Sequence, residues 1–243
     1  MAEGKREAKL KDPNSLSHKL LEVTSVIHRE AERRPFMVAF FKTQLPRDAY
    51  AEWLGRQWFV YSALEEVDEA LRDDPAVGRM YSPELHRRDR IQTDLEFWMG
   101  PDWRSLVSES PAAGAYAERI RDVGRDWPPA FVAHQWLRYL GNVLGQDLLK
   151  RLVRNSFDVT DQGVAFYDYP EVGDPKAYLG AYHARMNSVP LNDGDKQRVA
   201  EEGIRAFELN ISLTDELAGD FGIEATERDE ADHVVEDLTA DHP

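Results

Sequence analysis

The chain has 243 residues, 42% of them hydrophobic, which is enough for one large domain with a sizeable core. Its 45 acidic and 30 basic residues give a net charge of −15, and this field disfavours a nucleic-acid role. The sequence has no apolar run of 18 residues, no secretory signal and no cysteine. We therefore exclude a membrane anchor, disulfides and thiolate chemistry, and we expect a cytoplasmic protein.

Helical periodicity predicts a single all-α domain of seven or eight helices. The first helix should start after a cap signal at residues 12–15 and run to about Arg33. Prolines and glycines separate it from six further predicted helices: Arg47–Arg72, Ser82–Gly100, Ala112–Asp126, about Ala130–Arg154, Asp174–Val189 and Asp193–Gly219. Residues 163–170 (GVAFYDYP) are the only short extended candidate. We expect the domain to span residues 15–222, with an extension at 1–14 and an acidic, partly disordered tail at 223–243.

His28 is the first candidate for chemistry. It shares a face of the first predicted helix with Leu21, Thr24 and Ala31, and Glu32 follows one turn later. A histidine on such a face is more often a hydrogen-bonded core residue than a ligand. A carboxylate one turn away can, however, orient a metal-binding imidazole. The first helix alone leaves both interpretations open.

Two glycines, Gly141 and Gly145, interrupt an otherwise helical apolar pattern that continues to Leu152. Each glycine costs roughly 1 kcal/mol relative to alanine inside a helix, so something must come close to this backbone. A tight helix–helix crossing is one explanation. The other is a flat, bulky ligand such as haem, with a histidine on the facing helix.

Several longer stretches together resemble the haem oxygenases, over about residues 16–217. They are LSHKLLEVTSVIHREAE, YSALEE, PELHRRDRIQTDLEFWMGPDW, VAHQWLRYLG, YHARMNS and AFELNISLTDEL. The resemblance implies an all-α haem-oxygenase-like fold with haem held between a proximal and a distal helix. It also implies that His28, in an H-x-x-A-E pattern, is the proximal iron ligand, with Glu32 as its neighbour.

The implied reaction is oxidative cleavage of haem by O2 to biliverdin, ferrous iron and carbon monoxide. Ferredoxin or a flavoprotein reductase would supply the electrons, and we expect a monomer. The resemblance places Gly141, Asn142 and Gly145 at the catalytic distal side. The residues expected to bind haem are Lys19, His28, Glu32, Arg138, Tyr139, Gly141, Gly145, His183, Arg185, Phe207 and Asn210.

The sequence also departs from the family pattern. Asn142 stands where many members have an aspartate that organises proton delivery, and Trp136 stands in place of a tyrosine. Leu21, Leu179 and His183 replace basic residues that hold the haem propionates in those members. Lys19, Lys176, His183 and Arg185 are the remaining candidates for that contact.

Two other classes of protein stay open. The first is a haem-binding carrier or sensor without ring-opening activity, suggested by Asn142 and by the reduced set of basic residues. The second is a di-iron oxidase, which would need inward-facing carboxylates besides His28. Glu65, Glu66 and Asp94 are available for that purpose but resemble surface or supporting groups.

Overall fold

Nine α-helices make up most of residues 12–224, the part of the chain that this computed structural model describes, and no strand occurs there. The helices are α2 (Leu16–Glu32), α3 (Pro35–Phe41), α4 (Arg47–Ala70), α5 (Arg88–Met99), α6 (Trp103–Leu106), α7 (Pro111–Asp126), α8 (Phe131–Phe157), α9 (Pro175–Met186) and α10 (Asp193–Asp220). The all-α prediction is confirmed, although the expected number of helices was too low. Residues 1–11 and 225–243, which hold most of the predicted extension and tail, lie outside the described residues.

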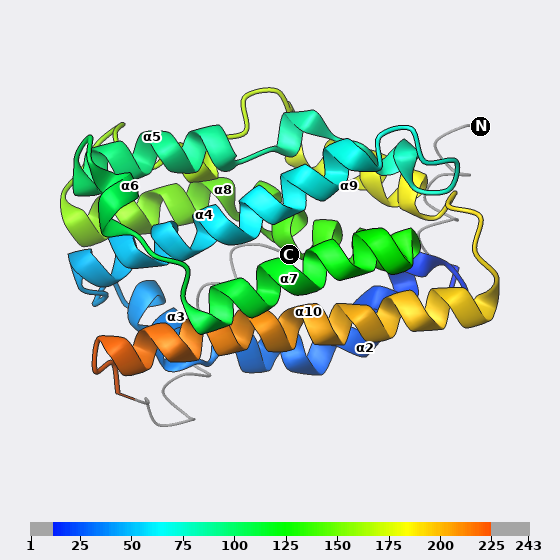
Figure 1. Cartoon of the computed structure of the whole chain (residues 1–243), viewed down its shortest axis with the longest axis horizontal. Coiled ribbons are helices and arrows are strands. Elements are labelled where there is room, and N and C mark those ends of the chain that lie inside the picture. The colour runs from blue at the N-terminus through cyan, green and yellow to red at the C-terminus, as the bar shows by residue number, and fades with distance from the viewer. Residues whose placement is uncertain (1–11, 225–243) are drawn as a thin grey trace.

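Long helices run along the longest axis of the molecule (Figure 1). The first and last described helices, α2 and α10, pack side by side, and α4 packs against α5 and α7. Gly203 allows the approach of α2 to α10, because a Cβ atom there would lie 2.7 Å from Leu20 Cδ2. Gly124 serves the same purpose on α7, where a Cβ would collide with Val67 of α4.

Short polar side chains fix the starts of several helices. Ser15 accepts a hydrogen bond from the His18 amide at the start of α2, as the cap signal at residues 12–15 predicts. Ser110, Asp174 and Asn192 cap α7, α9 and α10 in the same way. These caps satisfy amide groups that have no acceptor within the helix.

The segment 82–100 is not one helix, in contrast to the prediction. A 3-10 turn at Pro83–Leu85 ends before α5 begins at Arg88. The carboxylate of Glu65 on α4 accepts the backbone N–H groups of Arg87 and Arg88, and so caps α5 from a neighbouring helix. Burial raises the pKa of Glu65, and these N–H groups partly offset that rise. No local signal in the sequence marks such a cap.

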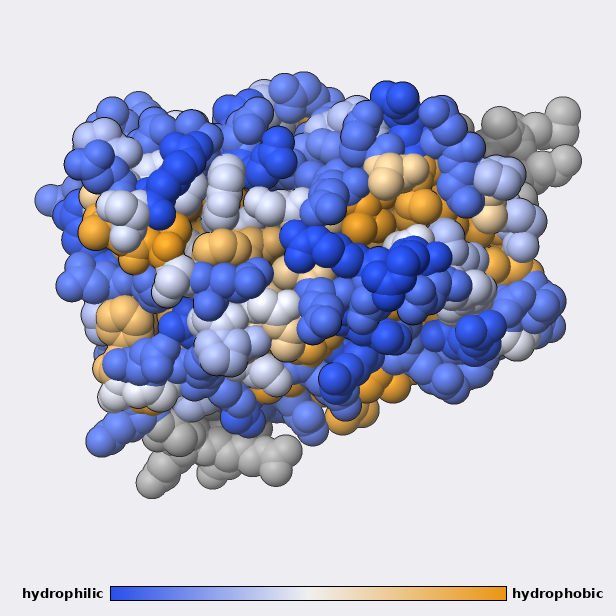
Figure 2. Space-filling view, in the orientation of Figure 1, coloured by the Kyte–Doolittle hydropathy of each residue, from blue (hydrophilic) through white to orange (hydrophobic). Residues whose placement is uncertain are grey.

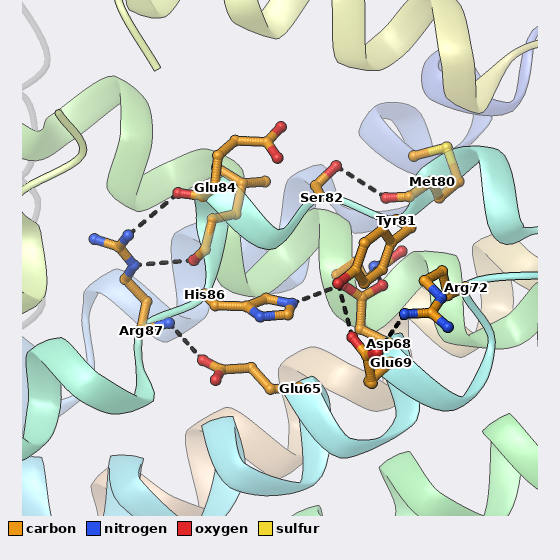
Figure 3. A network of polar contacts seen from close by, with 12 residues as sticks. Glu65, Asp68, Glu69, Arg72, Met80, Tyr81, Ser82, Glu84, His86 and Arg87 are labelled. Carbon is orange, nitrogen blue, oxygen red and sulfur yellow. Dashed lines mark hydrogen bonds and ion pairs between the residues drawn. The ribbon is translucent and has the colours of Figure 1, made fainter. Parts of the chain in front are cut away.

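The same region forms a polar network between α4 and the segment before α5 (Figure 3). Asp68 Oδ2 lies 2.8 Å from His86 Nε2, and its other oxygen accepts a hydrogen bond from Gln135 of α8. The guanidinium of buried Arg87 donates to the backbone oxygens of Leu85 and Asp168. The network therefore joins α4 and α8 to the segment before α5, and α8 carries several residues of the site described next.

Segment 163–170, the one extended candidate, contains a 3-10 turn at Ala165–Tyr167 instead of a strand. Asp94 of α5 holds this turn by accepting the N–H groups of Ala165 and Phe166 at 2.9 and 2.8 Å. The outer face in Figure 2 is mostly hydrophilic, with hydrophobic residues visible in separate patches. Among residues 12–224, none of the helices is both long and apolar enough to span a membrane.

Candidate functional site

A cavity of about 210 Å³ lies between α2, α3, α4, α8 and α10. Its walls combine one histidine, one arginine and one glutamate with amide and apolar side chains. The lining residues are His28, Ala31, Glu32, Met37, Phe41, Trp53, Leu137, Arg138, Gly141, Asn142, Leu149, Phe207, Asn210 and Thr214. Seven of the predicted site residues are therefore brought together: His28, Glu32, Arg138, Gly141, Asn142, Phe207 and Asn210.

His28 is not a core residue: its side chain is 60% exposed, at a cavity wall. Its ring packs on Phe207 of α10 with 5.3 Å between centroids, and its Nε2 lies 3.6 Å from Glu32 Oε1. A carboxylate beside one ring nitrogen orients the ring and makes the other nitrogen a better metal ligand.

The two glycines of α8 differ in their surroundings. A Cβ atom at Gly141 would meet none of the described residues within 4 Å, so this exposed backbone faces open space at the cavity. In the described part of the chain, a Cβ at Gly145 would meet only Leu149 of the same helix, at 3.3 Å. Within residues 12–224 no other helix comes within 4 Å of a Cβ at either position, which argues against the helix-crossing explanation. The bare backbone at Gly141 is suited to a flat ligand.

Arg138 is buried one turn before Asn142 on α8. Its guanidinium donates to the amide oxygens of Gln57 and Asn210 and lies 5.0 Å from the centre of the Tyr61 ring. Its buried Nε atom has no hydrogen-bond partner among residues 12–224, and the same holds for Nε2 of Gln57. Unsatisfied buried donors usually mark a place for an ordered water or a ligand.

Asn142 belongs to the same polar group. Its Nδ2 donates to the Tyr61 hydroxyl at 3.1 Å, and that hydroxyl donates to the Arg138 carbonyl at 2.7 Å. Burial raises the pKa of Tyr61, although the positive charge of Arg138 acts against this rise. The phenol therefore stays protonated at neutral pH, so Asn142 and Tyr61 can hold water but neither can ionise there.

Five of the predicted site residues do not line the cavity: Lys19, Tyr139, Gly145, His183 and Arg185. Tyr139 is fully buried and packs against Tyr61. His183 accepts a hydrogen bond from Trp136 Nε1 at 3.2 Å, and burial lowers its pKa to about 4. An uncharged, buried His183 is poorly suited to hold a propionate.

The two remaining cations point to other partners. Arg185 donates to Ser82 Oγ at 3.0 Å and lies in a separate groove beside Tyr178. Lys19 lies on α2 more than two turns before His28. The pKa of Asp193 on α10 is lowered by its hydrogen bond with Lys196, and the positive charge of Lys19 adds to this effect.

Several lining residues were not predicted from the sequence. Met37 and Phe41 come from α3, and Trp53 comes from α4. The signal for α3 is the apolar run PFMVAFF, in which a proline starts the helix. This run is only seven residues long, too short for helical periodicity to stand out.

The carboxylates considered for a di-iron centre serve other purposes. Glu65 caps α5, Asp94 holds the turn at 165–167, and Glu66 pairs with Arg121 at the surface. In the described part of the chain, no three His, Cys, Asp or Glu side chains gather as a metal site would require.

Known structures share this fold and define the class of protein. The crystal structure of heme oxygenase-1 from Synechocystis sp. in complex with heme superimposes with a TM-score of 0.82 at 35% identity, covering 85% of this chain and 93% of that one. The structure of heme oxygenase from Leptospira interrogans gives a TM-score of 0.79 at 31% identity, covering 83% and 99%.

Sequence comparison agrees with the structural likeness. The family model for heme oxygenase matches residues 14–216. The chain is 37% identical to "Heme oxygenase 1" of Homo sapiens over 208 residues, covering 84% of this chain and 72% of the human protein. The chain belongs to the haem oxygenase family. The predicted fold class and family are thus confirmed.

Proposed function

We propose that the protein is a haem oxygenase that binds haem in the 210 Å³ cavity and opens its ring with O2 to give biliverdin, ferrous iron and carbon monoxide. One observation carries the proposal: an exposed histidine on α2 and a bare glycine backbone on α8 line the same cavity. Haem supplies the oxygen-activating iron when it is bound.

The residues of the cavity suit separate roles. His28 would ligate the iron with Glu32 orienting its ring, and Phe207 would support the imidazole. Gly141 would let the macrocycle approach α8. Asn142 would hold water through its amide, and the unpartnered Arg138 Nε offers a further donor to such water.

Replacing His28 tests the proposal directly. His28→Ala should remove the haem spectrum of a histidine-ligated iron, and added imidazole should restore part of it, because the vacated space can hold a free imidazole. His18→Ala, on the same helix but outside the cavity lining, should bind haem like the unmodified protein. An unchanged spectrum in His28→Ala would show that another group ligates the iron.

A haem binder without ring-opening activity is the second candidate, because Asn142 cannot ionise. The two candidates differ in turnover. Haem with ascorbate or reduced ferredoxin should yield a biliverdin spectrum if the protein is an oxygenase. A haem band that persists under both reductants would favour the carrier or sensor.

The electron donor, the monomeric state and the cytoplasmic location are further proposals. No flavin or iron–sulfur motif was found in the sequence, and this supports an external donor such as ferredoxin or a flavoprotein reductase. Comparing the rate of ring opening with each donor would identify the better one. Sedimentation of the haem complex would test the monomer.

A further inference from the structure

A methionine of α3, Met37, lies in the wall of the cavity and has no role in the proposed function. Its thioether side chain is half-buried. The cavity is open to solvent, because the side chain of His28 in the same wall is 60% exposed. Met37 also lines an adjoining apolar cavity of about 70 Å³, and it shares both linings with Trp53 and Leu149. Met37 therefore lies where the two cavities adjoin, within reach of small solutes.

The other methionines of the described chain have different surroundings. Met80 and Met186 are 1% and 0% exposed, so the core covers their sulfur atoms. Met99 is half-buried like Met37, but it lies at the end of α5, outside the cavity lining. The sequence has no cysteine, so thioethers are the sulfur groups that an oxidant meets. In residues 12–224, an oxidant therefore reaches Met37 and Met99 more readily than the two buried methionines.

We propose that Met37 is an oxidation site through which peroxide lowers the affinity of the cavity for haem. This inference rests on the proposed function, because its consequence is a change in haem binding. In the step itself, the O–O bond of hydrogen peroxide breaks and one oxygen atom forms a bond to the Met37 sulfur. The other oxygen leaves as water with both protons. The sulfur loses two electrons and the peroxide gains them, which gives methionine sulfoxide.

The sulfoxide changes the chemistry of the cavity wall. A thioether is apolar, whereas a sulfoxide is polar and hydrated. Several neighbours of Met37 in the lining are apolar, among them Phe41, Trp53 and Leu149. A flat macrocycle that covers this part of the wall removes water from the sulfoxide, and a polar group buried without a partner costs binding free energy. We expect oxidation of Met37 to weaken haem binding about 10-fold. Methionine sulfoxide reductases reverse this oxidation, so the loss is reversible.

The experiment treats the haem-free protein with hydrogen peroxide, removes the peroxide, and then titrates the protein with haem. Met37→Leu keeps an apolar side chain of similar size, so its haem affinity should stay within about twofold of its untreated value. Met99→Leu is the matched control and should lose affinity on treatment as the unmodified protein does. Met37→Gln places a lasting polar group in the wall and should bind haem about 10-fold more weakly without any peroxide. Methionine sulfoxide reductase should restore the affinity of the treated unmodified protein.

Mass spectra of peptides from the treated protein locate the added oxygen independently of haem binding. They should show it on Met37 and Met99, and zinc protoporphyrin bound before the treatment should protect Met37 alone. Unchanged haem affinity in protein whose Met37 is fully oxidised would overturn the proposal, as would an equal loss of affinity in Met37→Leu. Failure of the untreated protein to bind haem would instead overturn the proposed function.

Discussion

The glycine at position 141 lowers the stability of α8 but leaves open space at the cavity. Because a Cβ there meets no described residue in the haem-free protein, Gly141→Ala should raise the free energy of unfolding of that form by about 1 kcal/mol. The same methyl group should weaken haem binding, since it occupies the side of α8 that faces the cavity. Thermal denaturation of the haem-free form and a haem titration measure the two effects.

Gly203 is the matched control for Gly141. A methyl group there collides with Leu20 at the crossing of α2 and α10, so Gly203→Ala should lower stability by roughly 1–3 kcal/mol. If Gly141→Ala also destabilised the haem-free form, α8 would be packed more tightly at this glycine than the structure shows.

Thr43 adopts a left-handed backbone conformation, with φ of 57°, just after α3. The N–H groups of Thr43 and Gln44 reach back to the oxygens of Phe40 and Ala39, so this conformation closes the helix. A β-branched residue is strained there, whereas glycine is not. Thr43→Gly should therefore raise the free energy of unfolding by about 1 kcal/mol in denaturant titrations. Thr43→Val keeps the branched side chain and should give no such gain.

At the scale of elements, the carboxylate that holds the turn at 165–167, Asp94, makes the stability of the protein depend on pH. Burial raises its pKa to about 6, although the two N–H groups it accepts favour the charged form. Because this pKa exceeds that of an unfolded aspartate, the native state binds more protons between about pH 4 and 6. The stability contributed by Asp94 is thus fully present below about pH 4 and is lost as the pH rises through 6.

Asp94→Asn should remove this dependence. We compare the free energy of unfolding of the unmodified protein with that of Asp94→Asn. The difference between them should fall by about 2 kcal/mol from pH 4 to pH 7. A difference that stays constant across this range would show that the carboxylate has an ordinary pKa.

The sequence predicts the long helices better than the short ones. Helix α7 was predicted within one residue and α10 was predicted within one residue of its end, because long amphipathic patterns average out local exceptions. The break at His86 and Arg87 was missed, since the cap of α5 comes from Glu65, more than twenty residues earlier. Contacts between distant residues leave no local trace in a sequence.

The same reason explains why only some of the predicted site residues line the cavity. Periodicity and resemblance identify His28 and Gly141 on their own helices, and the cavity joins them. His183 and Arg185 were grouped with them by resemblance alone. The direction of a side chain on a short helix such as α9 depends on packing that the sequence does not display.

For the molecule as a whole, the net charge of −15 should make stability depend on salt. Screening relieves repulsion among acidic groups, so we expect the melting temperature to rise by about 5 °C from 10 mM to 300 mM KCl. A rise confined to molar salt would reflect exclusion of solute from the surface instead. A flat profile would show that ion pairs such as Arg56 with Glu216 balance the excess charge locally.

The pairing of α2 with α10 has a consequence for synthesis of the chain on the ribosome. These helices lie near opposite ends of the described chain, and the cavity takes residues from both, from His28 to Thr214. Contacts of such high sequence separation form late in folding, because a long loop must close first. The helices from α3 to α9 can assemble as the chain emerges, but the cavity cannot be complete until most of α10 has left the ribosome. Haem capture is therefore expected to be post-translational, and a chain truncated before residue 193 should fail to acquire haem even where its other helices have formed.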